Sequence, residues 1–578
     1  MNGRSANPAL ITPRTEANPH FSVRAKGMIP RYPIEGVVYP SAEDADRYAR
    51  VGAWNPSTAG HVLRATAARF PDKSAIVDDD RHLTYSEFDE ATEQLGAALL
   101  ELGLRPGDRA IFQMGSVGET AIALLACAKA GVVPVCTLPQ HRAIEIGEMA
   151  ERSKPRAYFV QADFSAFDLV EFAADMASHR AIPHLIIARA GEQRSDGSLT
   201  FEGLIETQPL EQARRKLADI EVSIADVLMF QLSGGTTNVP KIMPRFHGEF
   251  LGLSRAKAIR SAMDEDMVAL YAMPLIHTAG QVAMLYPSIL FGGTCVLMRR
   301  MDAREFFTVV ERERATHSVS MGPAAIQMID YEGVGDHDLS SLRLLMNFHG
   351  SGVMEKHIGV PCLTTYGVGE GLIMSTDLSS PKEMRHDTVG WPLSPFDEIR
   401  IFEPDTEREV TQGDVGELCL RGPSSIRGYF KMPEVNRVSF TADGFFRTGD
   451  KMSAHEFDGQ ICYRFHGRIK DNINRGGEKI GAEEVEAIIV RHPDVADAKV
   501  VAMPDRLYGE RACAFLIMMP GAGPLTVRAL GDFLVNEGLA KFKSPERVET
   551  VDSYPVTRVG KVDRQVLRTQ IADIVARE

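Results

Sequence analysis

The chain has 578 residues, of which 44% are hydrophobic and 25% are charged, and its formal net charge is −14. This length exceeds what one compact core supports, so we expect a globular protein of two or more domains. The acidic balance argues against nucleic-acid partners and against binding to anionic membranes. No apolar run of membrane-spanning length occurs, and residues 1–20 lack the apolar stretch of a signal peptide, so we expect a cytoplasmic protein.

The seven cysteines are scattered along the chain and form no CxxC or Cys/His cluster. This pattern disfavours both a zinc site and a disulfide framework. Most of them stand among apolar residues, as Cys295 does. We therefore expect buried, reduced thiols in a reducing compartment.

Strands and helices alternate in the first half of the chain. Residues 1–50 are rich in Pro, Asn, Arg and Ser without clear periodicity, which predicts an N-terminal extension with some disorder. Apolar spacing then indicates a helix from Ala59 and another that Thr84 or Ser86 caps. Residues 190–222 are polar and are predicted to include a surface excursion. The expected strands are 74–77, 109–112, 132–135, 157–160 and 184–187, with a helix at 119–130, which predicts parallel α/β layering.

Further α/β units follow, and the pattern changes twice toward the C-terminus. We expect strands at 227–230, 293–298, 317–321 and 342–346, and a helix at 302–314. Residues 395–422 alternate apolar and polar positions around turns, as in a small β subdomain. Residues 471–578 carry their own helix–strand pattern and predict a small α+β domain.

The loop from Ser233 to Lys241 reads SGGTTNVPK and follows an apolar strand. Its glycines allow close backbone approach, its hydroxyls and amides suit phosphate oxygens, and Lys241 adds a positive charge. A P-loop is excluded, because Pro240 precedes the lysine and Ile242 follows it. The alternative is a surface turn that binds nothing.

This loop resembles the phosphate-binding loop of the acyl-adenylate-forming (AMP-binding) enzymes, and the resemblance extends from about Trp54 to the C-terminus. It implies an α/β fold: a large N-terminal domain of layered α/β subdomains plus a β subdomain, and a small mobile α+β C-terminal domain. The expected boundaries are an extension at 1–50, an AMP-binding domain at 51–469 and a mobile domain at 470–578.

The resemblance also implies a nucleotide site. The motif beginning at Tyr366 places that ring on adenine and assigns Glu370 to Mg²⁺, an ion that prefers oxygen ligands. Asp450 would accept hydrogen bonds from the ribose, and Arg468 would lie near ribose and phosphate. The alternative for Glu370 is a solvated carboxylate in a glycine-rich turn. The expected ATP/AMP-binding residues are Ser233, Gly234, Gly235, Thr236, Thr237, Lys241, Tyr366, Gly367, Glu370, Asp450 and Arg468.

Three further roles follow from the C-terminal motifs. Lys470 resembles the hinge residue of the family, and Gly476 and Gly477 resemble the loop that lets a pantetheine arm pass. Lys561 matches the catalytic lysine of adenylation, where a cation stabilises charge on the phosphates. The alternative is a solvated lysine near the chain terminus.

The aryl-acid branch, which includes 2,3-dihydroxybenzoate–AMP ligases and aryl-CoA ligases, is the most similar. That branch has His-Asn where this chain has His277 and Thr278, so we expect an aryl or related hydrophobic acid other than a strict catechol acid. The alternative for His277 is a core histidine with a satisfied ring. The expected pocket residues are His277, Thr278, Gly280, Gly350, Ser351, Gly352 and Val368.

The predicted activity is an ATP-dependent acid–thiol ligase that uses Mg²⁺ and transfers the acyl group to CoA. The alternative is a stand-alone aryl-acid–AMP ligase that loads a separate phosphopantetheinyl carrier protein. A non-catalytic nucleotide-binding homologue is disfavoured, because Glu370, Asp450 and Lys561 are all present. A homodimer is left open.

Overall fold

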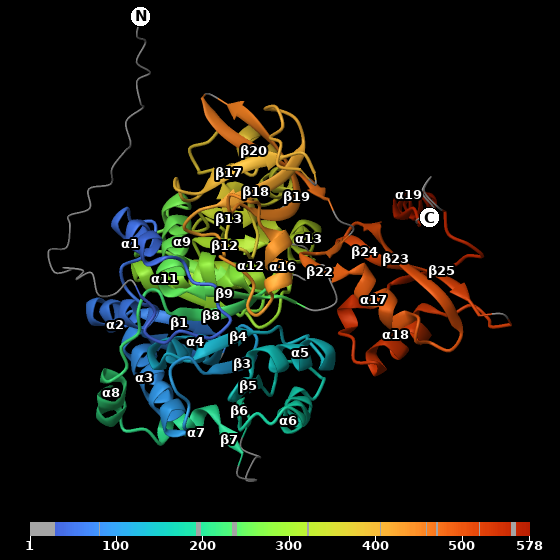
Figure 1. Cartoon of the computed structure of the whole chain (residues 1–578). Coiled ribbons are helices and arrows are strands. Elements are labelled where there is room, and N and C mark those ends of the chain that lie inside the picture. Colours follow the sequence, from blue (N-terminus) through green and yellow to red (C-terminus); the bar gives the residue numbers. More distant parts are fainter. Residues whose placement is uncertain are drawn as a thin grey trace, which may run out of the picture.

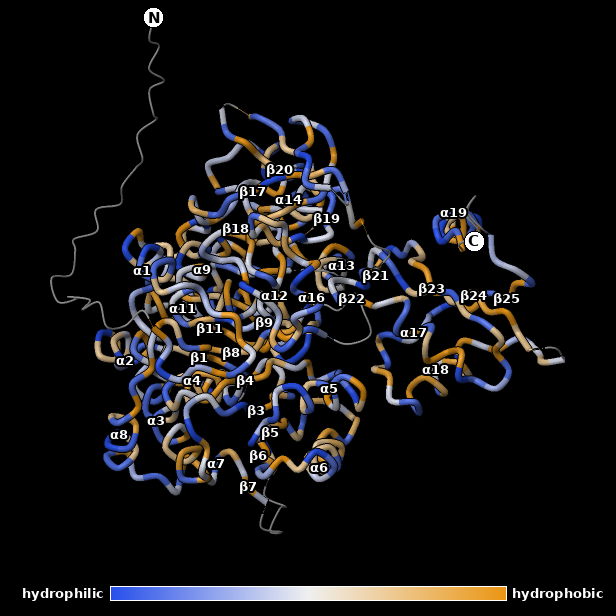
Figure 2. Tube along the Cα trace, viewed as in Figure 1, coloured by the Kyte–Doolittle hydropathy of each residue, from blue (hydrophilic) through white to orange (hydrophobic). Residues whose placement is uncertain are grey.

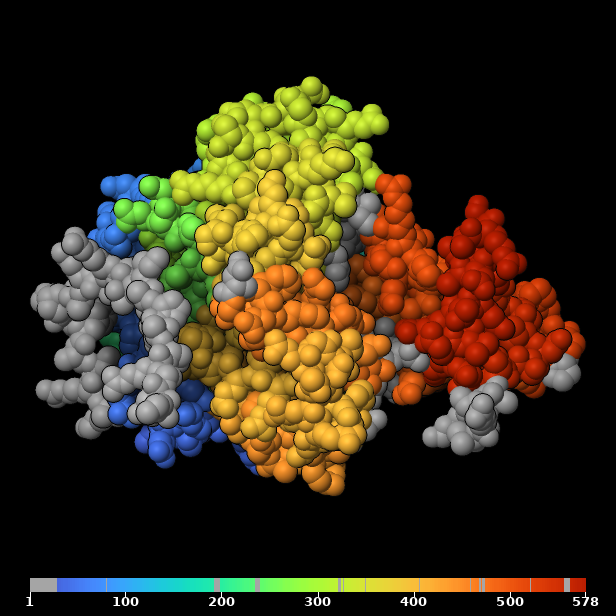
Figure 3. Space-filling view, turned by 90° about the horizontal axis from the view of Figure 1, so that it is seen from above, coloured from blue at the N-terminus to red at the C-terminus, as the bar shows by residue number. Residues whose placement is uncertain are grey.

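The computed structural model describes residues 29–79, 81–191, 198–233, 240–320, 323–348, 350–404, 406–457, 459–469, 472–519, 521–555 and 562–578. Figure 1 shows a large body and a smaller lobe at one side, which is formed by the C-terminal segment. The view in Figure 3, turned by 90°, again places the smaller lobe beside the large body.

One sheet of the large body combines the early strands with the strand that precedes the glycine-rich loop. Its order is β7-β6-β5-β3-β4-β8-β9, and all neighbours pair in parallel except β8 and β9. Parallel strands of this kind are buried on both faces, and their residues are accordingly apolar. The bounds are β3 (Arg109–Gln113), β4 (Val133–Cys136), β5 (Ala157–Gln161), β6 (His184–Ala188), β7 (Leu199–Thr200), β8 (Val227–Leu232) and β9 (Ile242–Phe246).

A second sheet of the large body has the order β16-β15-β14-β13-β12-β10-β11-β1-β2. Its central strands are parallel, while the pairs at its edges are antiparallel. The bounds are β1 (Ser74–Asp78), β2 (Arg81–Thr84), β10 (Val268–Tyr271), β11 (Thr294–Leu297), β12 (His317–Ser320), β13 (Leu344–Asn347), β14 (Cys362–Gly367), β15 (Ile373–Ser375) and β16 (Trp391–Pro392).

Helices cover both sheets, and α4 (Gly118–Ala130) is buried along its whole length. Such a helix is apolar on all sides, as its sequence GETAIALLACAKA largely is. Figure 2 shows apolar colour on central strands such as β1, β8 and β11, and hydrophilic colour on peripheral helices such as α8. The other helices of the large body are α1 (Ala42–Arg50), α2 (Ala59–Arg69), α3 (Tyr85–Glu101), α5 (Ala143–Ser153), α6 (Leu169–His179), α7 (Phe201–Glu206), α8 (Leu210–Ala218), α9 (His247–Arg260), α10 (Thr278–Gly280), α11 (Tyr286–Phe291), α12 (Ala303–Glu313), α13 (Pro323–Asp330), α14 (Ser351–Ile358), α15 (Lys382–Asp387) and α16 (Pro433–Ser439).

A β subdomain completes the large body. It is an antiparallel sheet in the order β17-β18-β19-β20, with β17 (Glu398–Phe402), β18 (Gly416–Arg421), β19 (Phe446–Phe457) and β20 (Gln460–Arg468). The smaller lobe has its own core, in which a mixed sheet packs against helices. Its elements are β21 (Asn472–Arg475), β22 (Glu478–Gly481), β23 (Val495–Asp505), β24 (Gly509–Met518), β25 (Arg547–Thr550), α17 (Ala482–Ile489), α18 (Val527–Asn536) and α19 (Arg564–Arg577).

This arrangement confirms the predicted fold class, with layered α/β subdomains, a β subdomain and a small α+β unit. Two segments contain helices that the sequence did not predict. Residues 190–222, predicted to include a surface excursion, contain α7 and α8, which bury Phe201 and Leu217. Residues 1–50 were predicted to be an extension with some disorder, and α1 (Ala42–Arg50) in this range packs on the large body through Tyr48.

The seven cysteines are buried, as expected. Within the described residues, no helix combines the length and the apolar content that a membrane crossing requires. The domain boundaries and the hinge at Lys470 stay predictions, and Lys470 itself lies outside the described residues.

Candidate active site

Two hydrogen bonds close the base of the predicted phosphate loop. The Ser233 amide donates to the Lys241 carbonyl at 2.9 Å, and the Lys241 amide donates to Ser233 Oγ at 3.1 Å. They continue the antiparallel pairing of β8 with β9, so the loop emerges from the end of a β-hairpin. Gly234, Gly235, Thr236 and Thr237 lie outside the described residues.

Lys241 and Glu370 meet at one aromatic side chain, Tyr429. The ammonium of Lys241 lies 4.7 Å from the centroid of the Tyr429 ring. The hydroxyl of Tyr429 donates to Glu370 Oε1 at 2.7 Å. A cation beside the phosphate loop and a buried carboxylate are therefore held at opposite parts of the same side chain.

Arg245 holds the turn that carries Glu370 through a hydrogen bond to its backbone. This fully buried guanidinium forms an ion pair with Glu249 and donates to the Gly369 carbonyl at 2.6 Å. Gly371 follows with φ +130°, and a Cβ at that position would lie 1.6 Å from the Ser424 carbonyl oxygen. Only glycine fits at position 371, so the close approach of the Ser424 backbone requires glycine directly after Glu370.

Tyr366 and Asp450 also come together. The Tyr366 hydroxyl donates to Asp450 Oδ2 at 2.6 Å, and both side chains are buried. Asp450 on β19 pairs in register with Arg468 on β20. Tyr366 and Gly367 end strand β14, which leads directly into the Glu370 turn.

The described nucleotide candidates thus form two sets of contacts. One joins Ser233 and Lys241 through Tyr429 to Glu370, and the other joins Tyr366 to Asp450. The short segment from Tyr366 at the end of β14 to Glu370 connects the two sets along the chain. The elements involved are β8, β9, β14 and β19, which come from both sheets of the large body's core and from the β subdomain. Their loop ends converge, which is the usual place for ligand sites in α/β proteins.

The predicted acid-pocket residues lie on three loops. His277 precedes α10, and its Nδ1 accepts a hydrogen bond from the Ala279 amide at 3.2 Å. Burial, with a smaller contribution from Lys479, lowers the pKa of His277 to about 4, so the ring is neutral at pH 7. Thr278 is half-buried beside it. The open side of Gly280 faces the Tyr271 ring, which fills the space that a side chain would take.

The other pocket candidates surround the starts of α14 and the Glu370 turn. Gly350 has φ +71° before α14, and the Ser351 hydroxyl accepts a hydrogen bond from Thr364 at 2.8 Å. A Cβ on Gly352 would lie 3.1 Å from the His386 ring, and Val368 is buried. Their contact with an acid substrate stays a prediction.

The smaller lobe reaches toward His277 with the turn between β21 and β22. Gly476 and Gly477 form this two-residue turn with φ of 63° and 100°, values that favour glycine. Lys479, two residues beyond the turn, influences the pKa of His277, and Glu478 influences that of Tyr271. Lys479 and Glu478, which directly follow the turn, therefore lie close enough to His277 and Tyr271 to affect their pKa values. That the glycine turn itself opens toward the acid pocket stays a prediction.

Lys561 lies outside the described residues, but the chain on both sides of it is anchored in the smaller lobe. The Asp563 amide donates to the Pro555 carbonyl at 2.8 Å. Arg564 donates to both carboxylate oxygens of Glu486 on α17, at 2.6 and 2.8 Å. The described residues on both sides of Lys561 therefore belong to the smaller lobe.

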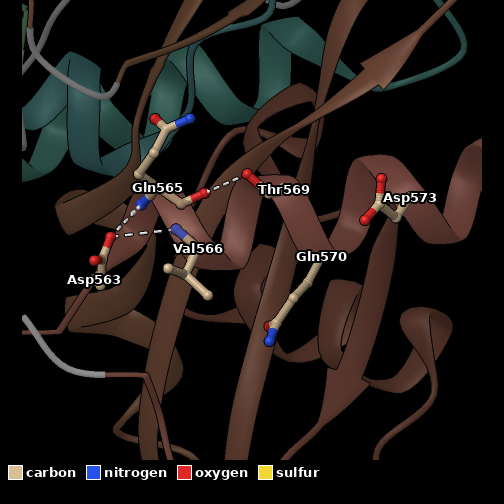
Figure 4. A pocket seen from close by; sticks show the side chains of 6 residues that line it. All are labelled: Asp563, Gln565, Val566, Thr569, Gln570 and Asp573. Carbon is tan, nitrogen blue, oxygen red and sulfur yellow. Dashed lines mark hydrogen bonds between the residues drawn. The ribbon is translucent and has the colours of Figure 1, made fainter.

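A surface hollow of about 250 Å³ lies along α19 (Figure 4). Asp563 accepts hydrogen bonds from the Gln565 and Val566 amides, which caps the helix. Thr569 donates to the Gln565 carbonyl at 3.0 Å. These contacts are explained by the helix itself, and the hollow shares none of the predicted site residues.

Comparison with known proteins identifies the family of the chain. A model of the AMP-binding enzymes matches residues 63–430, and a model of the AMP-binding enzyme C-terminal domain matches residues 484–561. The chain belongs to the AMP-binding enzyme family. It is an adenylate-forming ligase of the aryl-acid branch, as the sequence motifs predict.

Curated relatives share 32% to 38% identity over 91% to 92% of the chain. One is a 2,3-dihydroxybenzoate-AMP ligase of Bacillus subtilis, 35% identical over 92% of this chain and 97% of the relative. Another is a salicylyl-CoA synthase / salicylate adenylyltransferase of a Streptomyces species, 33% identical over 92% of this chain and 97% of the relative. Among solved structures, Mycobacterium smegmatis MbtA in its apo form is similar with a TM-score of 0.69 and 30% identity, covering 93% of this chain and 99% of that one.

Sequence reasoning missed two residues of this site. Tyr429 stands between motifs in a stretch without a recognisable pattern, and only its contacts with Lys241 and Glu370 identify it. Arg245 follows the phosphate loop, and its partners Gly369 and Glu249 become visible only in three dimensions. A buried arginine signals a structural partner, but the sequence does not reveal that it is buried.

Proposed function

We propose that this AMP-binding enzyme activates an aryl carboxylic acid with ATP and then transfers the acyl group to a pantetheine thiol. The observation that supports this proposal best is that the contacts Lys241–Tyr429–Glu370 and Tyr366–Asp450 are carried by the ends of one short segment, from Tyr366 to Glu370. Together they offer groups for the phosphates, the metal and the ribose of a nucleotide.

Glu370 has the chemistry that Mg²⁺ requires. Its carboxylate is held by the Tyr429 hydroxyl, and oxygen is the preferred donor for this hard cation. Within the described residues, no cluster of three or more His, Cys, Asp and Glu side chains forms a metal site. A single carboxylate fits the usual mode for Mg²⁺, in which the phosphates of the nucleotide supply further ligands. When bound, the ion neutralises charge on the phosphates.

In the first step, a carboxylate oxygen of the acid attacks the α-phosphorus of ATP, and pyrophosphate leaves. We assign Lys561 to this step, because an ammonium there stabilises the charge that is rearranged on the phosphate oxygens. Lys241 contributes charge from the phosphate loop. Asp450 accepts hydrogen bonds from the ribose hydroxyls, and the Tyr366 hydroxyl orients it.

In the second step, the thiolate sulfur attacks the acyl carbon, the bond to AMP breaks, and the thiol proton passes to solvent. The turn at Gly476 and Gly477 supports this step, because Lys479 beside it lies close enough to His277 to lower its pKa. We further propose that the smaller lobe rotates about Lys470 between the two steps, so that Lys561 leaves and this turn arrives.

The acid itself is proposed from the pocket chemistry. His277 is neutral at pH 7 and therefore offers a hydrogen bond or a flat apolar face rather than a charge. Thr278 offers one hydroxyl, which donates and accepts at a single atom, whereas an asparagine amide would donate from its NH2 group and accept at a separate carbonyl oxygen. A monocyclic aryl acid without a strict requirement for a catechol suits these groups.

The test is AMP release across a panel of benzoates, salicylates and dihydroxybenzoates, in the wild type and in Thr278→Asn. We expect acid-dependent AMP release by the wild type, and a shift of the variant toward 2-hydroxylated acids of about tenfold in kcat/KM. An identical panel profile for both proteins would place Thr278 outside the pocket. No turnover with any aryl acid would contradict the proposal.

The same panel distinguishes the acceptor. One arm contains CoA, a second contains a phosphopantetheinylated carrier protein, and a third contains no thiol. The sequence favours CoA, and the relatives' names include both AMP ligases and a CoA synthase. Thioester formation only with the carrier protein would identify the chain as a stand-alone aryl-AMP ligase.

A further inference from the structure

A buried ion cluster joins the two lobes. Lys543, at the end of the 3₁₀ turn η4 (Lys541–Lys543), has its ammonium 2.8 Å from Glu145 Oε1. The same ammonium donates to both oxygens of Glu484, at 2.8 and 3.0 Å. The side chains of Lys543, Glu145 and Glu484 are 5%, 0% and 6% exposed. Because these charged groups are shielded from water, each needs its partner, and removing one partner leaves a buried charge without compensation.

The cluster is divided unequally between the lobes. Lys543 and Glu484 both belong to the smaller lobe, whereas Glu145 is on α5 of the large body. The start of α5 adds a second contact, in which the Ile144 amide donates to the Gly538 carbonyl at 3.5 Å and the Ile144 side chain packs on the core of the smaller lobe. Glu145 also caps its own helix by accepting from the Arg142 amide at 3.0 Å. Its carboxylate is therefore fixed before the smaller lobe arrives.

The charges depend on the orientation of the lobes. In the present orientation, the two carboxylates raise the pKa of Lys543 against the effect of burial, so its ammonium stays charged. A rotation that withdraws the Gly476–Gly477 turn from His277 carries Lys543 away together with Glu484. Without the ammonium, the present orientation would bring two buried carboxylates to one point, which is strongly unfavourable.

A second ion pair between the described parts of the lobes is exposed. Arg506 contacts Asp330 of α13, but their side chains are 82% and 48% exposed. Solvent screens such a pair, and exposed pairs contribute little. Of these two ion pairs, the buried one at Lys543 therefore depends more strongly on the orientation of the lobes.

We propose that Lys543 is a positioning residue for thioester formation: its contact with Glu145 holds the smaller lobe where the Gly476–Gly477 turn faces the acid pocket. This inference rests on the proposed two-step function. Among the described residues, the ammonium of Lys543 is bonded to Glu145 and Glu484 and to none of the residues assigned to adenylation. We therefore expect adenylation to proceed without it.

The first experiment compares the two half-reactions in Lys543→Met. We expect acid-dependent ATP–pyrophosphate exchange within about twofold of the wild type, and thioester formation from supplied aryl-AMP reduced at least about tenfold. Lys541→Met, at an exposed lysine of the same turn, is the matched control and should leave both half-reactions unchanged. Equal loss of both half-reactions, or loss of neither, would overturn the proposal.

Glu145→Gln approaches the same contact from the other lobe. It should also reduce only thioester formation, but less than Lys543→Met, because Lys543 keeps its bonds to Glu484. The double variant Glu145→Gln/Lys543→Met should recover part of the loss, since only Glu484 then keeps its charge and the repulsion between two facing carboxylates is removed. An additive loss in the double variant would contradict a shared role.

The second experiment needs no substrate, so it separates failure of this inference from failure of the proposed function. Spin labels at Asp175→Cys on α6 and Arg528→Cys on α18 report the distance between the lobes, and the native cysteines are buried. We expect a narrow distance distribution in the wild type and in Lys541→Met, and a broader or displaced one in Lys543→Met. An unchanged distribution in a folded Lys543→Met protein would refute the positioning role.

Discussion

The Tyr429 hydroxyl fixes the direction of the Glu370 carboxylate. Its ring, at the same time, lies next to the Lys241 ammonium. A hydrogen bond to a charged group is worth about 1.5–3 kcal/mol, more than a bond between neutral groups. Tyr429 therefore connects the phosphate loop to the proposed metal ligand.

Tyr429→Phe removes this hydroxyl and keeps the ring beside Lys241. We expect the Mg·ATP concentration at half-maximal adenylation to rise about tenfold, with a smaller change in kcat, because Glu370 loses its fixed orientation. Titration of Mg·ATP in the pyrophosphate exchange assay measures this. Tyr554→Phe, which removes a hydroxyl bonded to the Phe515 carbonyl in the smaller lobe, is the control. Similar Mg·ATP dependence in both variants would contradict the role of Tyr429.

Sequence motifs identify individual site residues but not the contacts between them. The sequence motifs name Tyr366, Glu370 and Asp450, and the structure bonds Tyr366 to Asp450 and Glu370 to Tyr429. The motifs do not reveal that Tyr366 and Asp450 share a hydrogen bond, because that bond depends on how β14 and β19, which belong to different sheets, lie relative to each other. Lys561 and Lys470 stay predictions from the sequence alone.

Helix α9 carries a buried lysine that weakens the fold at neutral pH. Lys257 is 1% exposed, and among the described residues no acceptor forms a hydrogen bond with its Nζ. Burial, with a smaller contribution from Arg260, lowers its pKa to about 7 from the ordinary 10.5. Between these values the unfolded chain binds a proton that the folded protein does not. Stability therefore rises with pH across this window.

Lys257→Met removes the titrating group and keeps much of its volume. We expect the variant to be more stable than the wild type at pH 7, by on the order of 2–5 kcal/mol, with the difference shrinking toward pH 10. Denaturant unfolding at pH 7, 8, 9 and 10 measures this, with the exposed Lys541→Met as the control. A stability difference that does not vary with pH would contradict the lowered pKa.

At the element scale, periodicity predicted the parallel core well. The predicted strands at 109–112, 157–160 and 184–187 correspond to β3, β5 and β6, and the predicted helix at 119–130 corresponds to α4. These elements are recognisable because strands buried on both faces are continuously apolar. Helices α7 and α8 were missed because mostly polar sequence conceals the few apolar residues that they bury.

For the whole molecule, the proposed two-step function depends on the relative position of the lobes. In the present orientation, Lys479 beside the turn at Gly476 and Gly477 is close enough to His277 to lower its pKa, and the buried Lys543–Glu145 contact accompanies this orientation. No sequence pattern predicts this orientation, because it depends on contacts between surfaces that are far apart in the chain. That two loops alternate at the site stays a prediction from the sequence.

The proposed function requires that the loop at 233–241 and the distant Lys561 act on the same nucleotide, in the first step only. Lys561→Ala tests it in two assays on one protein: acid-dependent ATP–pyrophosphate exchange, and thioester formation from supplied aryl-AMP. We predict that exchange falls at least about a hundredfold, because the charge on the phosphates loses its cation, while thioester formation is retained. Exchange at the wild-type rate, or equal loss of both activities, would contradict the account.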